Sequence, residues 1–417
     1  MTNEENIICE NGIKIYNRPN TFYNPAQKLN RDITFEIVNE YFRVKKHVKI
    51  FCAMEASGIR GIRYLKSNEK YQVYFNDISS EAIKSIEDNL KLNGIYNFQQ
   101  IEKIVATDTI KAIITQKDCN IAMLETENYF DVIDIDPFGS CNKFVDNAFK
   151  SIKHNGLICF TCTDKAALCS KVDKCFVKYH SSIKKNFCKN ELPIRVLLSF
   201  ISRASSKYEY SIIPIVSFSV DYYLRVIIKV KKGHAKNVLK TNSYFLQCQC
   251  GNTVDIGLLN STLKSNCDYC QSKMKLYGPF WNNVLHDVII INKVLENIVE
   301  NENERLVGLF RYFKQELAIP FYYEMSHLSR YLKQNTIKMK TVLTVLSNMG
   351  YEVSLTHCNL DGFKTNAPIK VIYDVLVQLQ TDSLCVIPNP TVEALYNINF
   401  YKKLINSKLK PGSLPKK

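Results

Sequence analysis

The sequence predicts an α/β protein whose core is a doubly wound parallel sheet. Residues 48–54, 71–77 and 129–135 are short apolar runs rich in β-branched and aromatic residues, and a turn and a helical pattern follow each run. Strands that alternate with helices form parallel sheets. Because such sheets bind ligands at the carboxyl ends of their strands, we expect functional residues to follow these runs.

The composition indicates a globular protein with more than one domain. The chain has 417 residues, and 46% of them are hydrophobic, which is enough for sizeable cores. Lys and Arg total 55 against 40 for Asp and Glu, so the formal net charge is +15. This excess favours a polyanionic partner, with nucleic acid as the first candidate, although lysine also serves simply as a solubilising residue.

The sequence shows no recognisable targeting segment. It lacks an uninterrupted apolar run of the about 20 residues that a membrane-spanning helix needs. Its N-terminus, MTNEENIICENG, is acidic and has the pattern of neither a signal peptide nor a transit peptide. We therefore expect a soluble, intracellular protein without membrane contact, in either nucleus or cytoplasm, and the sequence implies no protein partner.

The first strand and its helix predict a nucleotide-binding loop. Residues 48–54 lead into a loop with Gly58 and a helix that begins near Ile59. Glycine allows close backbone approach, and a helix N-terminus offers unpaired N–H groups. Gly58 and Gly61 alone are a weak signal. The next strand ends in Asp77, roughly 20 residues after the loop, which is the spacing at which an acidic residue binds ribose hydroxyls.

The rest of the sheet continues the alternation. A third strand lies within residues 101–118, and either Asp108 or Asp118 is its terminal carboxylate. A fifth strand follows at residues 157–163. Two later runs at residues 210–232 have no helix between them, which favours an antiparallel pair at the sheet edge. That arrangement is common in methyltransferases that use S-adenosylmethionine.

The stretch YFDVIDIDPFG, residues 129–139, is the main candidate for a catalytic site. Its apolar run ends in Asp134 and Asp136 and opens into a Pro-Phe-Gly turn. Methyl transfer to an exocyclic amine suits this turn, because Asp136 and the Pro137 carbonyl can position a poorly nucleophilic amine and accept its protons. Phe138 can stack on the ring that carries the amine. A capped turn without chemistry is the alternative, since Asp and Pro are common turn formers.

Four of the 15 cysteines have the pattern of a structural zinc site. Cys248 and Cys250 form one close pair, Cys267 and Cys270 form another, and both lie within residues 244–276. Four thiolates leave no open coordination position, so zinc held there is structural. Unliganded thiols are the alternative, because the first pair is one residue shorter than the usual spacing.

The C-terminal half predicts a second domain with a winged-helix-like unit. Two short helical patterns within residues 325–349 precede a hairpin-like stretch. We place the domains at 1–235, 236–380 and 381–417, the last being a basic, mobile tail. Several basic side chains of this unit can follow a phosphate backbone, although single lysines usually mark a solvated face; they are Arg330, Lys333, Lys338, Lys340 and Lys364.

Together these motifs resemble one family, the tRNA N2-guanine dimethyltransferases that modify the guanosine between the D and anticodon stems. Ten segments carry the resemblance in order over residues 22–368, which is nearly the whole chain. They are FYNPAQKLNRD, ASGIRGIRYLK, NDISSEAIKSIEDNLKLNG, FDVIDIDPFGS, LICFTCTDKAALC, PIVSFSVDYYLRVIIKV, the cysteine cluster, GPFWNNVLHD, PFYYEMSHLSRYLK and GYEVSLTHCNLDGFKTNAP.

The resemblance implies a Rossmann-like class I methyltransferase domain, a C-terminal tRNA-binding domain, and transfer of one or two methyl groups from S-adenosylmethionine to guanine N2 in tRNA. The residues that it places at the donor are Arg31, Arg60, Asp77, Asp118 and Cys119, with Asp77 on the ribose and Asp118 preferred to Asp108 at the adenine. Those that it places at the guanine are Phe22, Asp136, Pro137 and Phe138.

Two departures and two alternatives accompany this resemblance. The family prefers an acidic residue where Cys52 stands and a small one where Glu55 stands, and its first cysteine pair has a longer spacing than CQC. Amino-group methylation of rRNA or DNA would use the same turn. A catalytically silent RNA-binding factor would keep the basic surface and the cysteine cluster.

Overall fold

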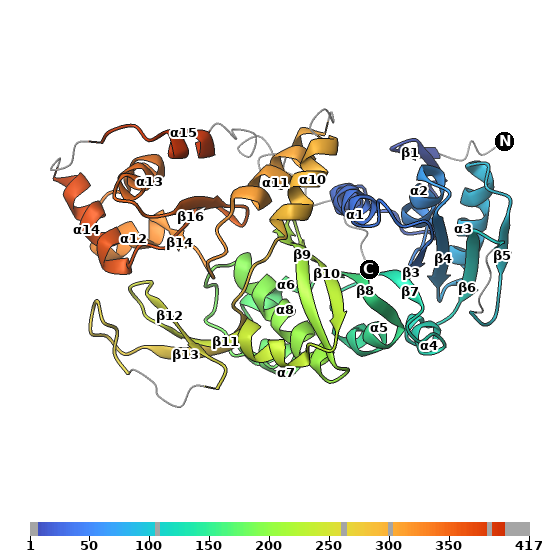
Figure 1. Cartoon of the computed structure of the whole chain (residues 1–417), viewed down its shortest axis with the longest axis horizontal. Coiled ribbons are helices and arrows are strands. Elements are labelled where there is room, and N and C mark those ends of the chain that lie inside the picture. Colours follow the sequence, from blue (N-terminus) through green and yellow to red (C-terminus); the bar gives the residue numbers. More distant parts are fainter. Residues whose placement is uncertain (1–6, 105–108, 260–264, 299–302, 382–385, 397–417) are drawn as a thin grey trace. The chain divides into compact units, whose positions relative to one another are not determined.

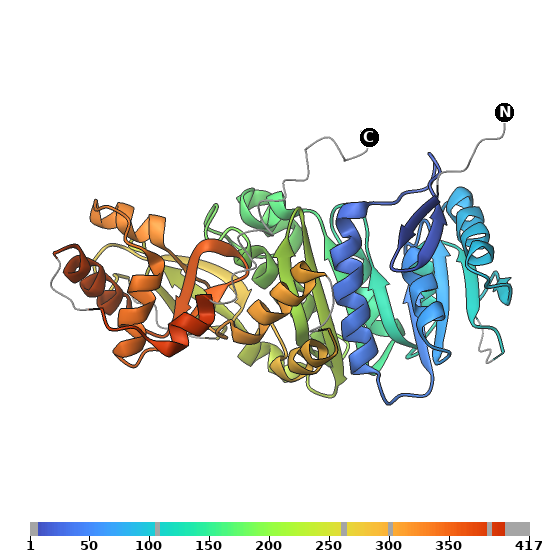
Figure 2. The same ribbon diagram turned by 90° about the horizontal axis from the view of Figure 1, so that it is seen from above.

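Two compact units make up the computed structural model, which describes residues 7–104, 109–259, 265–298, 303–381 and 386–396 (Figures 1 and 2). The first unit comprises residues 1–163, 201–215 and 225–235, and the second comprises residues 164–200, 216–224 and 236–417. The candidate Asp108 and most of the predicted tail lie outside the described residues. The domain boundaries drawn from the sequence stay a prediction.

An eight-stranded sheet forms the core of the first unit, in the order β5-β6-β4-β3-β7-β8-β10-β9. Its strands are β3 (Val48–Cys52), β4 (Tyr71–Asp77), β5 (Phe98–Gln100), β6 (Ala112–Gln116), β7 (Phe130–Ile135), β8 (Ile152–Cys162), β9 (Tyr210–Val220) and β10 (Tyr223–Lys232). The pairs from β5 through β8 are parallel, which confirms the doubly wound sheet. Only two residues join β9 to β10, so these strands form the antiparallel edge pair that the sequence predicts.

Burial explains why these sequences become central strands. All six residues of β7 are buried, as are six of the seven in β4, because helices cover both faces of a parallel sheet. The third predicted strand is β6, which ends at Gln116, just before Asp118. The short strand β5 and the earlier start of β8, at Ile152, were not predicted.

Figures 1 and 2 show α1–α3 on one face of this sheet and α4 and α5 on the other. These helices are α1 (Lys28–Tyr41), α2 (Ile59–Ser67), α3 (Ser80–Leu92), α4 (Cys119–Leu124) and α5 (Val145–Ser151). Gly61 is required where α2 packs on the sheet, because a Cβ there would lie 2.3 Å from the Phe75 ring. Ser79 caps α3 by accepting the Ala82 N–H at 3.3 Å.

The N-terminal segment packs in the first unit as a hairpin followed by a helix. It forms a hairpin of β1 (Ile7–Glu10) and β2 (Ile13–Tyr16), which the sequence pattern did not indicate. Helix α1 begins at Lys28, four residues before Asp32. Asp32 lies buried within the helix and pairs with Lys28 at 2.7 Å and Arg63 at 2.6 Å.

Two three-stranded sheets belong to the second unit, in the orders β12-β11-β13 and β14-β16-β15. Their strands are β11 (Asn242–Gln247), β12 (Thr253–Gly257), β13 (Lys275–Trp281), β14 (Tyr323–Glu324), β15 (Val353–Thr356) and β16 (Asn359–Thr365). The first sheet carries the cysteines. In the second, two helices precede the antiparallel β15–β16 hairpin, which is the winged-helix-like arrangement that the sequence predicts.

The remaining helices are α6 (Lys165–Cys169), α7 (Val172–Tyr179), α8 (Glu191–Ser206), α9 (Val238–Thr241), α10 (Val288–Ile298), α11 (Glu304–Gln315), α12 (Met325–Leu332), α13 (Met339–Asn348), α14 (Ile369–Gln380) and α15 (Pro390–Tyr396). Helix α8 begins in the second unit and ends in the first. In the described part of the chain, no helix has the length and apolar character needed to cross a membrane.

Candidate active site and cysteine cluster

The carboxyl end of β7 lies where the strand order of the sheet reverses. Strand β3 has β4 on one side and β7 on the other, so successive connections lead in opposite directions. Open α/β sheets bind ligands at such a switch point. Asp134 lies in β7 and Asp136 follows it directly, so the predicted catalytic turn stands at the ligand-binding edge.

Arg60 joins the two carboxylates of this turn. Its Nη1 donates to Asp134 Oδ2 at 3.3 Å, and its Nη2 donates to Asp136 Oδ2 at 2.5 Å. Burial lowers the pKa of Arg60, but the Asp134 and Asp136 carboxylates raise it above its ordinary value, so the guanidinium stays charged. The Arg60 side chain is 9% exposed, whereas that of Asp136 is 23% exposed and can reach a ligand.

Arg225 is a buried member of the site that sequence reasoning missed. It lies in β10, and its Nη1 and Nη2 donate to the two Asp134 oxygens at 2.9 and 2.7 Å. Burial raises the pKa of Asp134, but Arg225 and Arg60 outweigh burial and hold it below its ordinary value. The available signal was an arginine inside an otherwise apolar strand, where an unpaired charge is too costly.

Phe22 and Phe138 are brought together, as the resemblance implies. Their ring centroids lie 4.9 Å apart with the planes at 77°, an edge-to-face contact. Phe138 is 82% exposed and Phe22 is 38% exposed. Such exposure of two aromatic rings beside a charged turn leaves apolar surface for a flat ligand.

Asp77 and Asp118 end or follow neighbouring strands on the other side of β3. Asp77 accepts the Ala56 N–H and the Ser79 N–H, both at 3.0 Å, which ties the loop after β3 to the end of β4. Asp118 is exposed and caps α4 by accepting the Asn120 N–H at 2.7 Å. A carboxylate has about four acceptor positions, so both residues retain capacity for a ligand.

Arg31 is buried and makes several contacts within the first unit. It is 6% exposed, and its Nε and Nη2 donate to the Glu10 carboxylate at 2.7 and 2.5 Å. The Asn24 carbonyl accepts from it at 3.3 Å. Most of its donors therefore bind the β1–β2 hairpin and the segment before α1.

The loop after β3 contains a buried carboxyl group, Glu55. Glu55 accepts the Gly61 N–H at 2.6 Å. Burial raises the pKa of Glu55 to about 7. Burial also raises the pKa of Cys52 well above its ordinary value, so its thiol is neutral.

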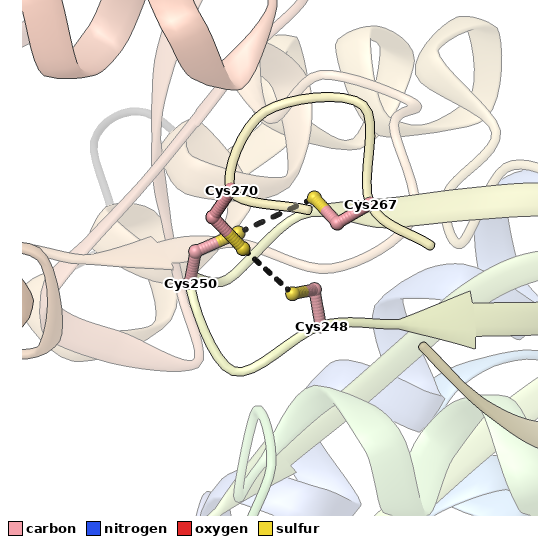
Figure 3. Close-up of side chains that lie close together, drawn as sticks. All are labelled: Cys248, Cys250, Cys267 and Cys270. Carbon is pink, nitrogen blue, oxygen red and sulfur yellow. Dashed lines mark hydrogen bonds between the residues drawn. The ribbon is translucent and has the colours of Figure 1, made fainter. Parts of the chain in front are cut away.

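The four predicted zinc ligands converge in the second unit (Figure 3). Cys248 and Cys250 follow β11, while Cys267 and Cys270 precede β13. The Sγ atoms of Cys248 and Cys270 lie 3.3 Å apart, and those of Cys250 and Cys267 lie 3.7 Å apart. A tetrahedral zinc with bonds of about 2.3 Å needs sulfurs about 3.8 Å apart. The donor set therefore fits zinc, and the shortened first pair does not prevent convergence.

A second buried cluster in this unit was not expected from the sequence, and it corrects one expectation: Lys364 is 1% exposed, so it does not face a phosphate backbone. Glu316 accepts from Lys364 Nζ at 3.0 Å and lies 2.5 Å from His357 Nδ1. Neither ring nitrogen of the neighbouring His286 has a hydrogen-bond partner among the described residues, and its Nε2 is 3.9 Å from Glu316. Since the Lys364 ammonium already balances the Glu316 carboxylate, this cluster is a buried ion network.

Comparison with known proteins decides the family. The family model described as N2,N2-dimethylguanosine tRNA methyltransferase matches residues 3–377. The chain belongs to this family. It is 32% identical over 379 residues to the tRNA (guanine(26)-N(2))-dimethyltransferase of Pyrococcus abyssi, covering 89% of this chain and 96% of that protein. The Schizosaccharomyces pombe enzyme of the same name is 32% identical over 356 residues, which are 78% of this chain and 62% of that protein.

A solved family structure supports the same conclusion. Trm1 from Pyrococcus horikoshii, in complex with S-adenosyl-L-methionine, matches with a TM-score of 0.78 and 29% identity, covering 88% of this chain and 99% of that one. The predicted family and fold class are therefore confirmed. The roles of single residues in this family site stay predictions.

Proposed function

We propose that this protein transfers one or two methyl groups from S-adenosylmethionine to the exocyclic N2 of a guanosine in tRNA. The observation that carries the proposal is the turn after β7, where the partly exposed Asp136 carboxylate stands beside the exposed Phe138 ring. The names of the relatives give guanine 26 as their target, so we propose the same position here. An intracellular location belongs to this proposal.

Asp136 aims the amine and takes its proton. S-adenosylmethionine supplies an electrophilic methyl group when bound. Guanine N2 is a weak nucleophile because its lone pair is delocalised into the ring, so the Asp136 carboxylate and the Pro137 carbonyl accept its N–H groups and hold it in line. As the nitrogen–carbon bond forms and the sulfur–carbon bond breaks, the nitrogen becomes positive. Asp136 receives its proton or relays it to water.

Phe138 and Phe22 hold the base after it leaves the tRNA stack. A base between two parallel rings requires a ring separation of about 7 Å, twice the van der Waals contact distance. The observed rings are 4.9 Å apart and nearly perpendicular. We therefore propose that the two rings separate when the guanine enters, with Phe138 stacking on it.

The donor binds on the β3 and β4 side of the turn. Gly58 has a φ of 79°, a left-handed conformation that favours glycine and allows the loop to turn into α2. We propose that Asp77 binds the ribose hydroxyls and that Asp118, with the Cys119 backbone, binds the adenine. Two of the five N–H groups of Arg60 bind carboxylates, so the others are available to S-adenosylmethionine. Arg31 belongs to the proposed set as well.

Nucleoside mass spectrometry of tRNA incubated with protein and donor tests this function. We expect N2-methylated guanosine in a tRNA transcript that carries guanosine at position 26, and none in a matched transcript with adenosine there. Methylated rRNA or DNA with unmodified tRNA would replace the proposed substrate. Folded protein that neither binds the donor in calorimetry nor modifies any nucleic acid would contradict the enzyme assignment.

We further propose that Cys248, Cys250, Cys267 and Cys270 hold one structural zinc. The convergence of their Sγ atoms supports this, and the Tyr373 hydroxyl donates to the Cys250 carbonyl at 2.6 Å, which connects the cluster to α14. Metal analysis of purified protein should find one zinc per chain. Replacing all four cysteines by serine should abolish zinc binding, while zinc retained by that variant would place it elsewhere.

A further inference from the structure

Four buried or partly buried charges form a chain in the first unit, which we name the Arg225 relay: Arg225, Asp134, Arg60 and Asp136. Arg225 and Asp134 are fully or almost fully buried, with side-chain exposures of 0% and 3%, while Asp136 reaches solvent. The relay thus runs from the interior of the sheet to the proposed catalytic carboxylate. Neither Arg225 nor Asp134 has a role in the function proposed above.

We propose that Arg225 and Asp134 are positioning residues for methyl transfer, because together they fix the Arg60 guanidinium that orients Asp136. This inference rests on the proposed catalytic role of Asp136. It explains why Asp134, one strand period before Asp136 and on the same face of β7, is also a carboxylate.

Arg225 has no capacity to act directly on a ligand. Its Nε donates to Thr34 Oγ1 at 3.2 Å, and its Nη2 donates to the same oxygen at 2.9 Å. Its Nη1 donates to Thr161 Oγ1 at 2.9 Å. With its two bonds to Asp134, these contacts match the five N–H donors of a guanidinium. Hydrogen bonds to residues of α1, β7 and β8 therefore fix Arg225 in place, and it can influence the site only through Asp134.

Asp134 transmits this fixed geometry to Arg60. Its Oδ2 accepts from both Arg225 and Arg60, so the two guanidinium groups share one carboxylate oxygen. The Nη2 of Arg60 then points to Asp136. Without Asp134, the Arg60 side chain would be free to take other rotamers, and the Asp136 carboxylate would lose a fixed partner. A shift of about 1 Å at a reacting group can cost 100-fold in rate.

A purely structural role would not require these charges. Buried ion pairs contribute little net stability, because desolvation offsets their attraction, and apolar residues of similar size often replace them without loss. The relay ends at a partly exposed carboxylate next to an exposed ring, and packing alone does not require such an arrangement. A role in holding Asp136 in place explains why this chain of residues is charged.

The test compares Asp134→Asn with Asp131→Asn. Asp131 is a matched control because it lies in β7, is 1% exposed, and is paired with Lys45 at 2.6 Å and Lys153 at 3.0 Å at the other end of the strand. We expect Asp134→Asn to lower kcat about 100-fold, with the tRNA KM little changed and a smaller loss of S-adenosylmethionine affinity in calorimetry, because Arg60 also belongs to the proposed cofactor site. Asp131→Asn should lower the melting temperature but leave kcat near the wild-type value.

Arg225→Lys and Arg225→Met provide a second comparison if Asp134→Asn does not fold. Lysine keeps the charge but not the fork, so it should retain more of kcat than methionine does. Equal kcat in Asp134→Asn and wild type, or equal loss in the two Asp variants, would overturn the relay. Asp136→Asn distinguishes the two ideas: if it is inactive while Asp134→Asn is fully active, only the relay fails, whereas an active Asp136→Asn removes the proposed catalytic role itself.

Discussion

Each unit contains a network of buried charges. One network reaches a partly exposed side chain, and the other contains only buried ones. The Arg225 relay in the first unit leads to Asp136, whose side chain is 23% exposed. In the second unit, Lys364 pairs with Glu191 at 3.2 Å and with Glu316 at 3.0 Å, and all three side chains are at most 1% exposed. There the network closes on itself, because Glu191 also pairs with the fully buried Arg195, which donates to main-chain carbonyls.

This difference teaches how a buried charge can be interpreted. Charges that end on one another and on backbone carbonyls join elements, here α8, the segment after α11 and strand β16. Charges that end on an exposed group present that group to a ligand. Removing one partner from the enclosed network should therefore mainly destabilise its unit, because a buried charge loses its partner, while removing one from the Arg225 relay should also lower turnover.

The largest expected effect is the loss of turnover when Asp136, the solvent-facing member of the Arg225 relay, is changed. Asp136→Asn removes the proposed proton acceptor but keeps the shape of the side chain, so kcat should fall by about 10² to 10⁴-fold with little change in donor affinity. Single-turnover methylation of tRNA and calorimetry with the donor measure the two quantities. Asp146→Asn is the control, because Asp146 is a 49% exposed carboxylate in an ion pair with Lys207. Equal activity of the two variants would contradict the interpretation.

The next largest effect is on the stability of the enclosed network, which consists of Arg195, Glu191, Lys364 and Glu316. Glu316→Gln leaves Lys364 with one carboxylate and should lower the free energy of unfolding by about 3 to 5 kcal/mol. The chain has one tryptophan, Trp281, which is 1% exposed and whose carbonyl accepts from Arg195 at 2.8 Å. Its fluorescence in a denaturant titration therefore reports on this unit.

Glu393→Gln is the matched control for that experiment. Its pair with Lys340 has a similar length, 2.7 Å, but the two side chains are 46% and 41% exposed. An exposed ion pair contributes about 0 to 1 kcal/mol. If Glu316→Gln costs no more than Glu393→Gln, the enclosed network has no special role in stability.

The sequence was sufficient for the fold and for the residues at strand ends. Apolar β-branched runs followed by turns locate β3, β4 and β7, because burial on both faces leaves a continuous pattern. The carboxyl ends of parallel strands meet at one edge, so Asp77, Asp118 and Asp136 could be expected there. The two cysteine pairs could be matched because thiolate spacing is a local property.

Contacts between distant strands could not be predicted in this way. Arg225 and Asp134 are 91 residues apart, and no local pattern indicates that β10 lies two strands from β7. The partner of Arg31 was missed for the same reason, because Glu10 belongs to a hairpin without a strong strand pattern. The network around Glu316 likewise joins residues from separate helices and strands.

A smaller effect on tRNA methylation is expected when Phe138, next to Asp136, is changed. Phe138→Ala removes one stacking surface, which is worth about 1 to 3 kcal/mol per base, so tRNA methylation at low tRNA concentration should slow correspondingly. Tyr96→Ala is the control, because Tyr96 is 75% exposed in the same unit and has no proposed role. The kcat/KM for tRNA measures both variants. An equal change in both would show that exposed aromatic surface, and not the turn, is responsible.

The last expected effect is the pH dependence of the enclosed network. Burial lowers the pKa of His286 to about 4, from an ordinary value of 6.5, so its contribution to stability is lost as pH falls from 6.5 towards 4. Although burial lowers the pKa of His357, neighbouring Cys358 and Glu316 raise it to about 10. Its contribution is therefore full below pH 6.5 and is lost as pH rises towards 10.

Unfolding followed by Trp281 fluorescence should consequently show greatest stability near pH 6.5. The Arg225 relay has no histidine, and the pKa of Asp134 is lowered, so its contribution is lost only when pH falls below the ordinary value of about 3.8 and on through the lowered one. Burial raises the pKa of Glu55 in the first unit to about 7, so the protection of β7 amides, corrected for the intrinsic exchange rate, should vary little only above pH 7. His357→Gln should remove the alkaline decline. If the decline persists in that variant, the pH dependence of the second unit arises from groups outside the enclosed network.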